Sequence, residues 1–179
     1  DYDNIRDCVE RTIPGFEKYN ARSRIDGGFY LPNPPRDKRV FNTENGLANI
    51  ITHKLQPIVA GNDKFVMMTI RSHDQYNTTI YSTNDRYRGI SNGRRVVMMS
   101  LEDIETRGWK EFQSVCIKSH FEGNEISSEG WTILEYDIPP GNVATYFPES
   151  NVLIPLESVA DSSNTPTSKS VVVSIEPMN

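Results

Sequence analysis

Short apolar runs of strand length, separated by turn-forming residues, constrain the fold of this chain more than any other feature. Such runs occupy residues 65–71, 95–99, 112–118, 131–136 and 170–175. Apolar runs of about four to eight residues between turn signals are typical of buried strands. The triplet Glu122-Gly123-Asn124 lies between the third run and the fourth and predicts a hairpin. We therefore expect a mainly β fold with a few short helices, arranged as a barrel-like domain.

One helix signal directly follows the second apolar run. Ser100 can cap a helix, and Asp103 stands three residues further on, a capping box with aspartate in place of glutamate. Leu101 and Ile104 would form the apolar side of this helix, so we expect both to be buried. Gly108 can then end the helix in a left-handed conformation.

The N-terminal part of the chain has a different pattern. Apolar or small residues recur at helical spacing at Ile5, Cys8, Val9, Thr12 and Ile13. Pro14 would end this helix. Residues 26–45 contain a glycine pair, a proline pair and a run of charges. They predict an extended connection with a strand near Val40-Phe41.

Composition excludes several classes of function. The chain has 24 acidic and 19 basic residues and a net charge of -5. A nucleic-acid binder needs a basic surface that replaces counterions, so we expect no nucleic-acid partner. No apolar run approaches the about 20 residues that span a bilayer, so we expect no membrane span. Cys8 and Cys116 are far apart and no CxxC pair occurs, which argues against a zinc site or a disulfide framework.

The densest polar stretch follows the first apolar run. Residues 69–79 read Thr-Ile-Arg-Ser-His-Asp-Gln-Tyr-Asn-Thr-Thr. So many donors and acceptors at a strand end suit a ligand with several hydrogen-bonding edges, such as a nucleotide or a pterin. A solvated loop of turn-forming residues is the other interpretation. A hydrolase triad of Ser72, His73 and Asp74 is disfavoured, because consecutive residues of an extended chain point to opposite faces.

Two further groups of residues could contact a ligand. Residues 146–151 join an aromatic pair to a lone amide, Asn151, although an aromatic packing corner explains them equally well. Residues 165–170 contain Lys169, the only lysine or arginine after Lys118. A lone cation ahead of a strand can hold an anion or pair with a neighbouring carboxylate, and the residues alone favour the ion pair.

Taken in order, these segments resemble one known domain. The motifs are the run at 69–79, Asn-Asp-Arg-Tyr-Arg-Gly at 84–89, Thr-Tyr-Phe-Pro-Glu-Ser-Asn-Val-Leu-Ile-Pro at 145–155 and Thr-Pro-Thr-Ser-Lys-Ser at 165–170. Together they resemble the C-terminal molybdopterin dinucleotide-binding domain of molybdenum oxidoreductases, particularly formate-dehydrogenase-like alpha subunits. The resemblance covers residues 40–179, and residues 1–28 look like the segment that leads into that domain.

The resemblance implies a double-psi β-barrel at residues 41–179, preceded at residues 1–40 by a helix and an extended linker. The cofactor would be bis(molybdopterin guanine dinucleotide) carrying Mo or W. Asn151 matches an amide that pairs with a pterin edge, Phe147 an aromatic stacking position, and Lys169 the basic residue ahead of the final strand. The positions that match cofactor-binding residues are Arg71, Ser72, His73, Asp74, Gln75, Tyr76, Asn77, Thr78, Phe147, Asn151 and Lys169.

The residues that carry catalysis and bind the metal in such enzymes belong to other domains, and nothing in this chain matches them. We therefore expect the chain to hold the cofactor without turning over substrate by itself. Its partners would be the remaining domains of the same cytoplasmic oxidoreductase. Two alternatives stay open: a free-standing barrel subunit of a multi-subunit molybdo- or tungsto-enzyme, and a non-enzymatic all-β interaction module.

Overall fold

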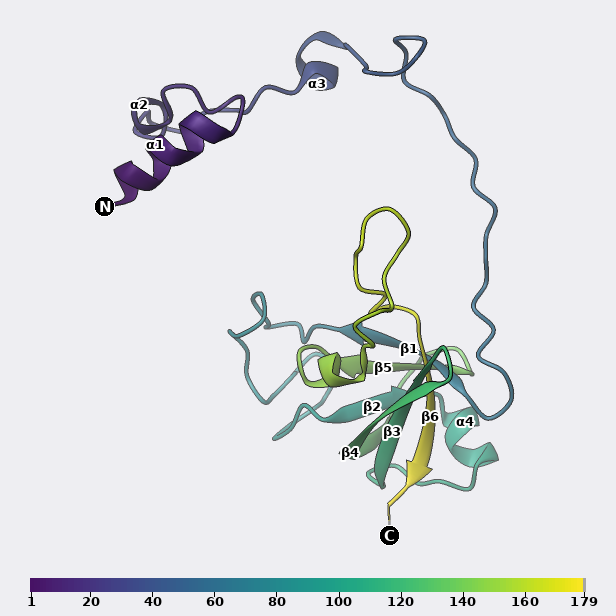
Figure 1. Cartoon of the computed structure of the whole chain (residues 1–179). Helices are drawn as coiled ribbons and strands as arrows, with labels where there is room; N and C mark the ends of the chain where they lie inside the picture. The colour runs from purple at the N-terminus through teal and green to yellow at the C-terminus, as the bar shows by residue number, and fades with distance from the viewer. Residues whose placement is uncertain (179) are drawn as a thin grey trace. The chain divides into compact units, whose positions relative to one another are not determined.

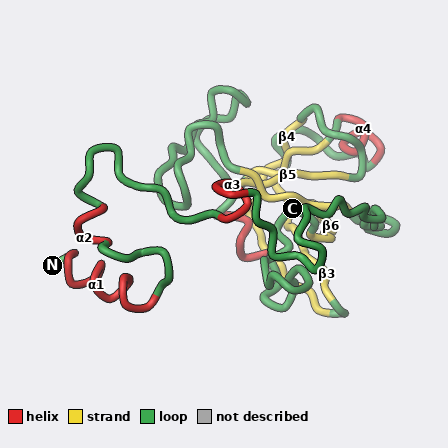
Figure 2. The backbone as a smooth tube through the Cα atoms, turned by 90° about the horizontal axis from the view of Figure 1, so that it is seen from above, coloured by secondary structure: helices red, strands yellow, loops and turns green. Residues whose placement is uncertain are grey.

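The computed structural model describes residues 1–178 and divides into two compact units, Asp1–Leu55 and Gln56–Asn179. The first unit contains three short helices, α1 (Tyr2–Thr12), α2 (Tyr19–Arg22) and α3 (Pro34–Lys38). The strands all belong to the second unit, as the yellow segments in Figure 2 show.

In the first unit, the predicted N-terminal helix is confirmed as α1, and none of its residues is buried. The extended connection predicted after it is wrong at Pro34–Lys38, where α3 forms. The side chain of Asn33 accepts a hydrogen bond from the backbone N–H of Arg36 at 3.1 Å, and prolines occupy the first helical positions, which tolerate a missing N–H. The strand predicted near Val40-Phe41 is also wrong, because those residues form no regular structure.

The second unit is a closed barrel of the strands found within residues 1–178, in the order β1-β5-β2-β4-β3-β6 (Figure 1). The strands are β1 (Phe65–Ile70), β2 (Val96–Met99), β3 (Ser114–Phe121), β4 (Asn124–Glu135), β5 (Asn142–Tyr146) and β6 (Val171–Pro177). β1 pairs in parallel with β5, and β2 with β4, while the other neighbours are antiparallel. The predicted mainly β, double-psi barrel class is confirmed, as is the β3–β4 hairpin.

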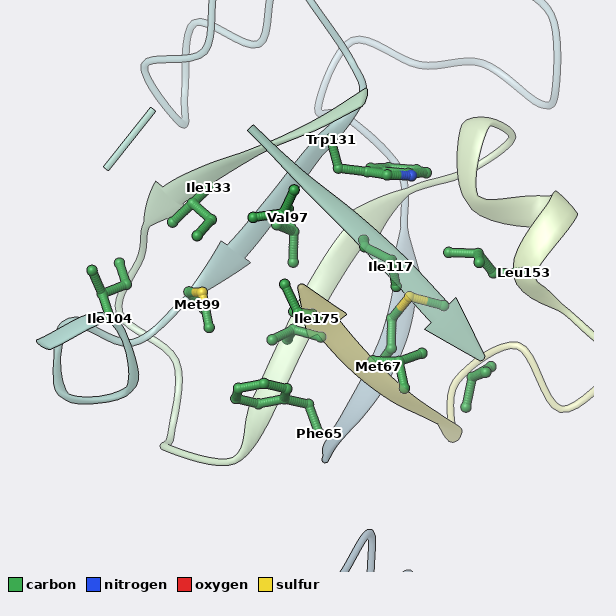
Figure 3. Close-up of a cluster of buried hydrophobic side chains, with 14 of the residues drawn as sticks. Phe65, Met67, Val97, Met99, Ile104, Ile117, Trp131, Ile133, Leu153 and Ile175 are labelled. Atoms are coloured by element: carbon green, nitrogen blue, oxygen red, sulfur yellow. The ribbon is translucent and has the colours of Figure 1, made fainter. Parts of the chain in front are cut away.

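The core of the barrel consists of apolar side chains from every strand (Figure 3). The labelled side chains are Phe65, Met67, Val97, Met99, Ile104, Ile117, Trp131, Ile133, Leu153 and Ile175. β2 is buried along its whole length because its two faces meet different apolar clusters. Val97 and Met99 face this core, whereas Val96 and Met98 pack with Tyr146 in the second cluster. That double burial explains the uninterrupted apolar run in the sequence.

The helix after β2 is confirmed as α4 (Leu101–Thr106). The Ser100 side chain accepts a hydrogen bond from the Asp103 N–H at 3.1 Å, and Gly108 has a φ of 67°, as the capping pattern predicts. Ile104 is buried, but the predicted burial of Leu101 is wrong, since that side chain is 48% exposed. A helix of six residues has fewer than two turns, and Ile104 is the residue through which it reaches the core.

Candidate functional site

Three chain segments meet at one end of the barrel because of how β1 is paired. Ile70 and Tyr146, the last residues of β1 and β5, are partners in a parallel ladder, so both strands end at the same edge. The N–H of Phe147 donates to the Ile70 carbonyl at 2.8 Å. On the other side of β1, the Thr69 N–H donates to the Ser168 carbonyl at 2.9 Å. The loops after β1 and β5 and the segment ahead of β6 therefore lie together.

A cavity of about 560 Å³ lies where these segments meet, and we call it the Lys169 cavity. It is lined by Thr69, Ile70, Arg71, Phe147, Ser168 and Lys169. The guanidinium of Arg71 stands 5.8 Å from the centre of the Phe147 ring. Two cations and one aromatic ring around a single cavity suit a ligand that combines an anionic group with a flat ring system.

Lys169 is held by the end of β1. Its ammonium donates to the carbonyl of Thr69 and lies 3.4 Å from the Thr69 hydroxyl. A lysine ammonium has three N–H donors, so at least one remains for a ligand. Among residues 1–178, the ion pairs with carboxylates do not include Lys169.

Ser72 and Gln75 turn into the protein. Ser72 is 4% exposed, and its N–H donates to the Gln75 side-chain oxygen at 3.2 Å. The Gln75 amide donates in turn to the carbonyls of Asn77, at 3.0 Å, and Phe147, at 2.9 Å. Both side chains also accept hydrogen bonds from Arg94. These two residues hold the loop to its neighbours.

His73 approaches a buried carboxylate, that of Asp85. The backbone N–H of His73 donates to Asp85 at 3.3 Å, and the Tyr146 hydroxyl and the Arg88 guanidinium donate to it at 2.8 Å and 2.7 Å. Burial alone would raise the pKa of Asp85, but these donors outweigh it and bring the pKa to about 2. Burial, with the nearby Asp85 charge, raises the pKa of Tyr146. At neutral pH the Asp85 side chain is therefore an ionised carboxylate, and these donors hold it in place.

The rest of the loop is exposed. Asp74 lies 3.9 Å from the Arg86 guanidinium. Tyr76 begins a tight turn that includes Asn77 and Thr78, and Asn77 has a φ of 53°, a left-handed conformation that asparagine tolerates better than most residues. These side chains are free to contact a ligand from solvent.

Asn151 lies apart from the cavity lining. It belongs to the 3₁₀-helix η1 (Glu149–Leu153) and is exposed. Its backbone N–H donates to the Pro148 carbonyl at 2.9 Å. In the part of the chain that the structure describes, neither Asn77 nor Asn151 lines the Lys169 cavity, whereas Arg71 and Phe147 do.

Four residues that organise this end of the barrel are absent from the set of cofactor-binding residues predicted from the sequence. Asp85 and Arg88 belong to the family-like motif at 84–89, and membership of that motif is the sequence signal that could have indicated them. The sequence signal for the other two is weak: Arg94 is a charged residue beside an apolar run, and Tyr146 is an aromatic residue at a strand end. Their importance follows from contacts across 53 to 61 residues of sequence.

Residues 1–178 contain no group of three or more His, Cys, Asp or Glu side chains placed to hold a metal ion. None of the helices in that part of the chain is long and apolar enough to cross a membrane.

Comparison with family models identifies the domain. The model described as "Molydopterin dinucleotide binding domain" matches residues 65–172, from the first residue of β1 into β6. This match covers more than half of the chain. The chain therefore belongs to the molybdopterin dinucleotide-binding domain family.

Curated relatives extend the comparison. The chain is 44% identical over 182 residues to an uncharacterized oxidoreductase of Mycobacterium tuberculosis, covering 99% of this chain and 23% of the relative. It is 40% identical over 185 residues to Protein YdeP of Escherichia coli, covering 100% of this chain and 24% of the relative. The chain thus spans about a quarter of the length of these relatives. Among solved structures, acetylene hydratase from Pelobacter acetylenicus aligns with a TM-score of 0.44 and 6% identity, over 64% of this chain and 18% of that one.

Proposed function

We propose that this chain is the cofactor-binding C-terminal domain of a molybdopterin oxidoreductase and that its Lys169 cavity receives part of the pterin dinucleotide. The observation that carries the proposal is the meeting of Arg71, Phe147 and Lys169 around one cavity. Membership of the molybdopterin dinucleotide-binding family supports it, as does similarity to a mycobacterial protein named as an oxidoreductase.

The residues present fit such a cofactor. A pterin dinucleotide combines phosphate charge with flat heterocycles, and the cavity combines two cations with an aromatic ring. Arginine can hold two phosphate oxygens at once, whereas the ammonium of Lys169 acts as a point charge with a spare donor. The exposed side chains of His73, Asp74 and Asn77 would add donors and acceptors for heterocycle edges.

The chemistry would be divided between cofactor and protein. The bound cofactor supplies a redox-active metal, and the protein supplies binding and orientation. In this chain, Arg71 and Lys169 would neutralise phosphate charge, and Phe147 would exclude water from one side of the cavity. Catalytic groups would come from the remaining domains of the same oxidoreductase, so the isolated chain would be inactive.

The type of enzyme, the form of the cofactor and the domain bounds proposed next rest on the family resemblance of the sequence. We propose a formate-dehydrogenase-like enzyme of the cytoplasm that carries bis(molybdopterin guanine dinucleotide) with Mo or W. Residues 1–40 would lead in from the preceding domain, and residues 41–179 would form the binding domain. Ser72, Gln75, Tyr76, Thr78 and Asn151 would complete the binding set, with Ser72 and Gln75 acting by holding the loop.

The test is cofactor content in the full-length oxidoreductase. Lys169→Ala should lower the bound pterin and metal per protein, because it removes a charge-assisted hydrogen bond that is worth about 1.5–3 kcal/mol. Lys118→Ala is the matched control, since that lysine pairs with Glu176 on the barrel wall at 2.7 Å. Fluorescence of the oxidised pterin, metal analysis and nucleotide release measure occupancy. Wild-type protein without pterin would contradict the proposal and favour an interaction module.

A further inference from the structure

Arg94 joins the two loops that contain most of the candidate cofactor residues. Its side chain is only 4% exposed and donates to the Ser72 hydroxyl at 2.8 Å and the Gln75 side-chain oxygen at 2.9 Å, both in the loop after β1. It also donates to the Phe147 carbonyl at 2.8 Å and the Glu149 carboxylate at 2.7 Å, both after β5. One buried side chain thus ties together two segments that extend beyond the β1–β5 ladder.

These contacts require a guanidinium. Arginine presents five N–H donors in a planar fork, and four separate acceptors are engaged here. The flat face of the group also stacks near two rings, 3.9 Å from the centre of Tyr81 and 4.8 Å from that of Tyr146. A lysine would keep the positive charge but would offer three donors from one point and no flat face. The site is therefore specific for arginine and not merely for a cation.

The hydrogen bonds of Arg94 also fix the groups around it. Because the Gln75 oxygen accepts from Arg94 and from the Ser72 N–H, the Gln75 amide nitrogen is turned toward the carbonyls of Asn77 and Phe147. The Phe147 carbonyl accepts from both Gln75 and Arg94, which anchors the peptide that carries the ring at the cavity. Removing Arg94 would release both loops together.

We propose that Arg94 is a positioning residue for the pterin dinucleotide, which rests on the function proposed above. Arg94 is outside the lining of the Lys169 cavity, and its donors point to protein acceptors. Its role is to hold residues 71–77 and Phe147 in the arrangement that the cofactor binds. Affinity for the cofactor then depends on a side chain that does not contact it.

Arg94→Lys in the full-length oxidoreductase tests this inference against Arg95→Lys as a matched control. Arg95 is the adjacent residue, but it bonds Ser128 at 2.6 Å and lies over Trp131, away from the cavity. The Arg94 variant should hold about tenfold less pterin per protein, the change expected when hydrogen bonds to a charged group are lost. The control should stay at the wild-type level. Hydrogen exchange in the cofactor-free proteins should rise for residues 72–79 and 147–151 of the Arg94 variant and stay unchanged in the barrel strands.

Two kinds of result would overturn the inference. Wild-type pterin content with unchanged exchange in both loops would show that Arg94 does not position them. Faster exchange throughout the barrel, or an Arg94→Lys protein that fails to fold when Arg95→Lys folds, would make Arg94 a general scaffold residue. If wild-type protein carries no pterin, the function proposed above fails, and loop exchange still decides whether Arg94 orders the two loops.

Discussion

In the interior of the barrel, Trp131, Ile117 and Phe65 are fully buried among other apolar side chains, whereas at the end where β1 and β5 finish, the buried side chains include Asp85 and Arg94. The interior is stabilised by removing apolar surface from water, which does not depend on orientation or pH. The loop end is held by charged and polar groups that lose their hydration on burial. The free energy gained from their contacts is therefore largely offset by the free energy of desolvation.

This difference separates the fold from the site. Apolar burial fixes the barrel, and directional hydrogen bonds fix the shape of the loops that would meet the cofactor. Substitutions in the interior should therefore change the free energy of unfolding, while substitutions at the loop end should also change cofactor content.

Trp131→Ala should lower the free energy of unfolding by about 3–5 kcal/mol, because it removes a fully buried aromatic side chain and leaves a cavity. Urea unfolding of the chain measures the change. Leu101→Ala is the control, since that side chain is 48% exposed. Equal costs for the two variants would contradict the view that apolar burial at the barrel core holds the fold.

Asp85→Asn should cost about 3 kcal/mol at neutral pH, because it leaves the largely buried Arg88 guanidinium without a countercharge. The same unfolding measurement applies. Asp74→Asn, at an exposed aspartate 3.9 Å from Arg86, should leave stability unchanged. A neutral effect of Asp85→Asn would mean that the loop end tolerates an unpaired charge.

Acid should weaken the loop end through Asp85. The pKa of this residue is about 2 in the folded chain, against an ordinary value of 3.8, so its contribution is complete above pH 3.8. About 2 kcal/mol should be lost as the pH falls from 3.8 through 2, because the unfolded chain takes up the proton first. The difference between wild type and Asp85→Asn should therefore shrink over that range. A constant difference would contradict the lowered pKa.

Lys118→Gln should have the smallest effect. This lysine pairs with Glu176 at 2.7 Å between β3 and β6, but both side chains are partly exposed and the pair is screened by solvent and salt. We expect an unchanged midpoint of thermal unfolding and unchanged cofactor content. A clear loss of stability would show that surface charge, in addition to apolar burial, holds the barrel wall.

Most of the barrel could be predicted from local pattern. Strands with apolar runs were predictable because a strand that is buried on both faces has an apolar side chain at every position, as β2 does. β5 was missed because its sequence, Asn-Val-Ala-Thr-Tyr, is short and mixed and follows a proline pair. The α3 helix was missed although Asn33 ahead of two prolines is a recognised start signal.

The site was only partly predictable, for a different reason. Arg71, Phe147 and Lys169 belong to motifs that could be recognised in order along the chain. Arg94 reaches Phe147 across 53 residues and Asp85 reaches Tyr146 across 61, and a single sequence contains no record of such contacts. Local propensity therefore reveals strands more readily than it reveals the polar side chains that orient loops.

Closure of the barrel has a consequence for synthesis of the protein. β1 is the first strand of the barrel to leave the ribosome, yet its antiparallel neighbour is β6, whose residues 171–177 come last among the described strands of the barrel. Until β6 emerges, β1 and β3 each present an unpaired edge that can pair with other chains. Pairing between strands so far apart in sequence is slow. The edges of β1 and β3 therefore stay exposed until β6 has been made and has paired with them. Protection by chaperones during translation should matter more for this domain than its stability after folding would suggest.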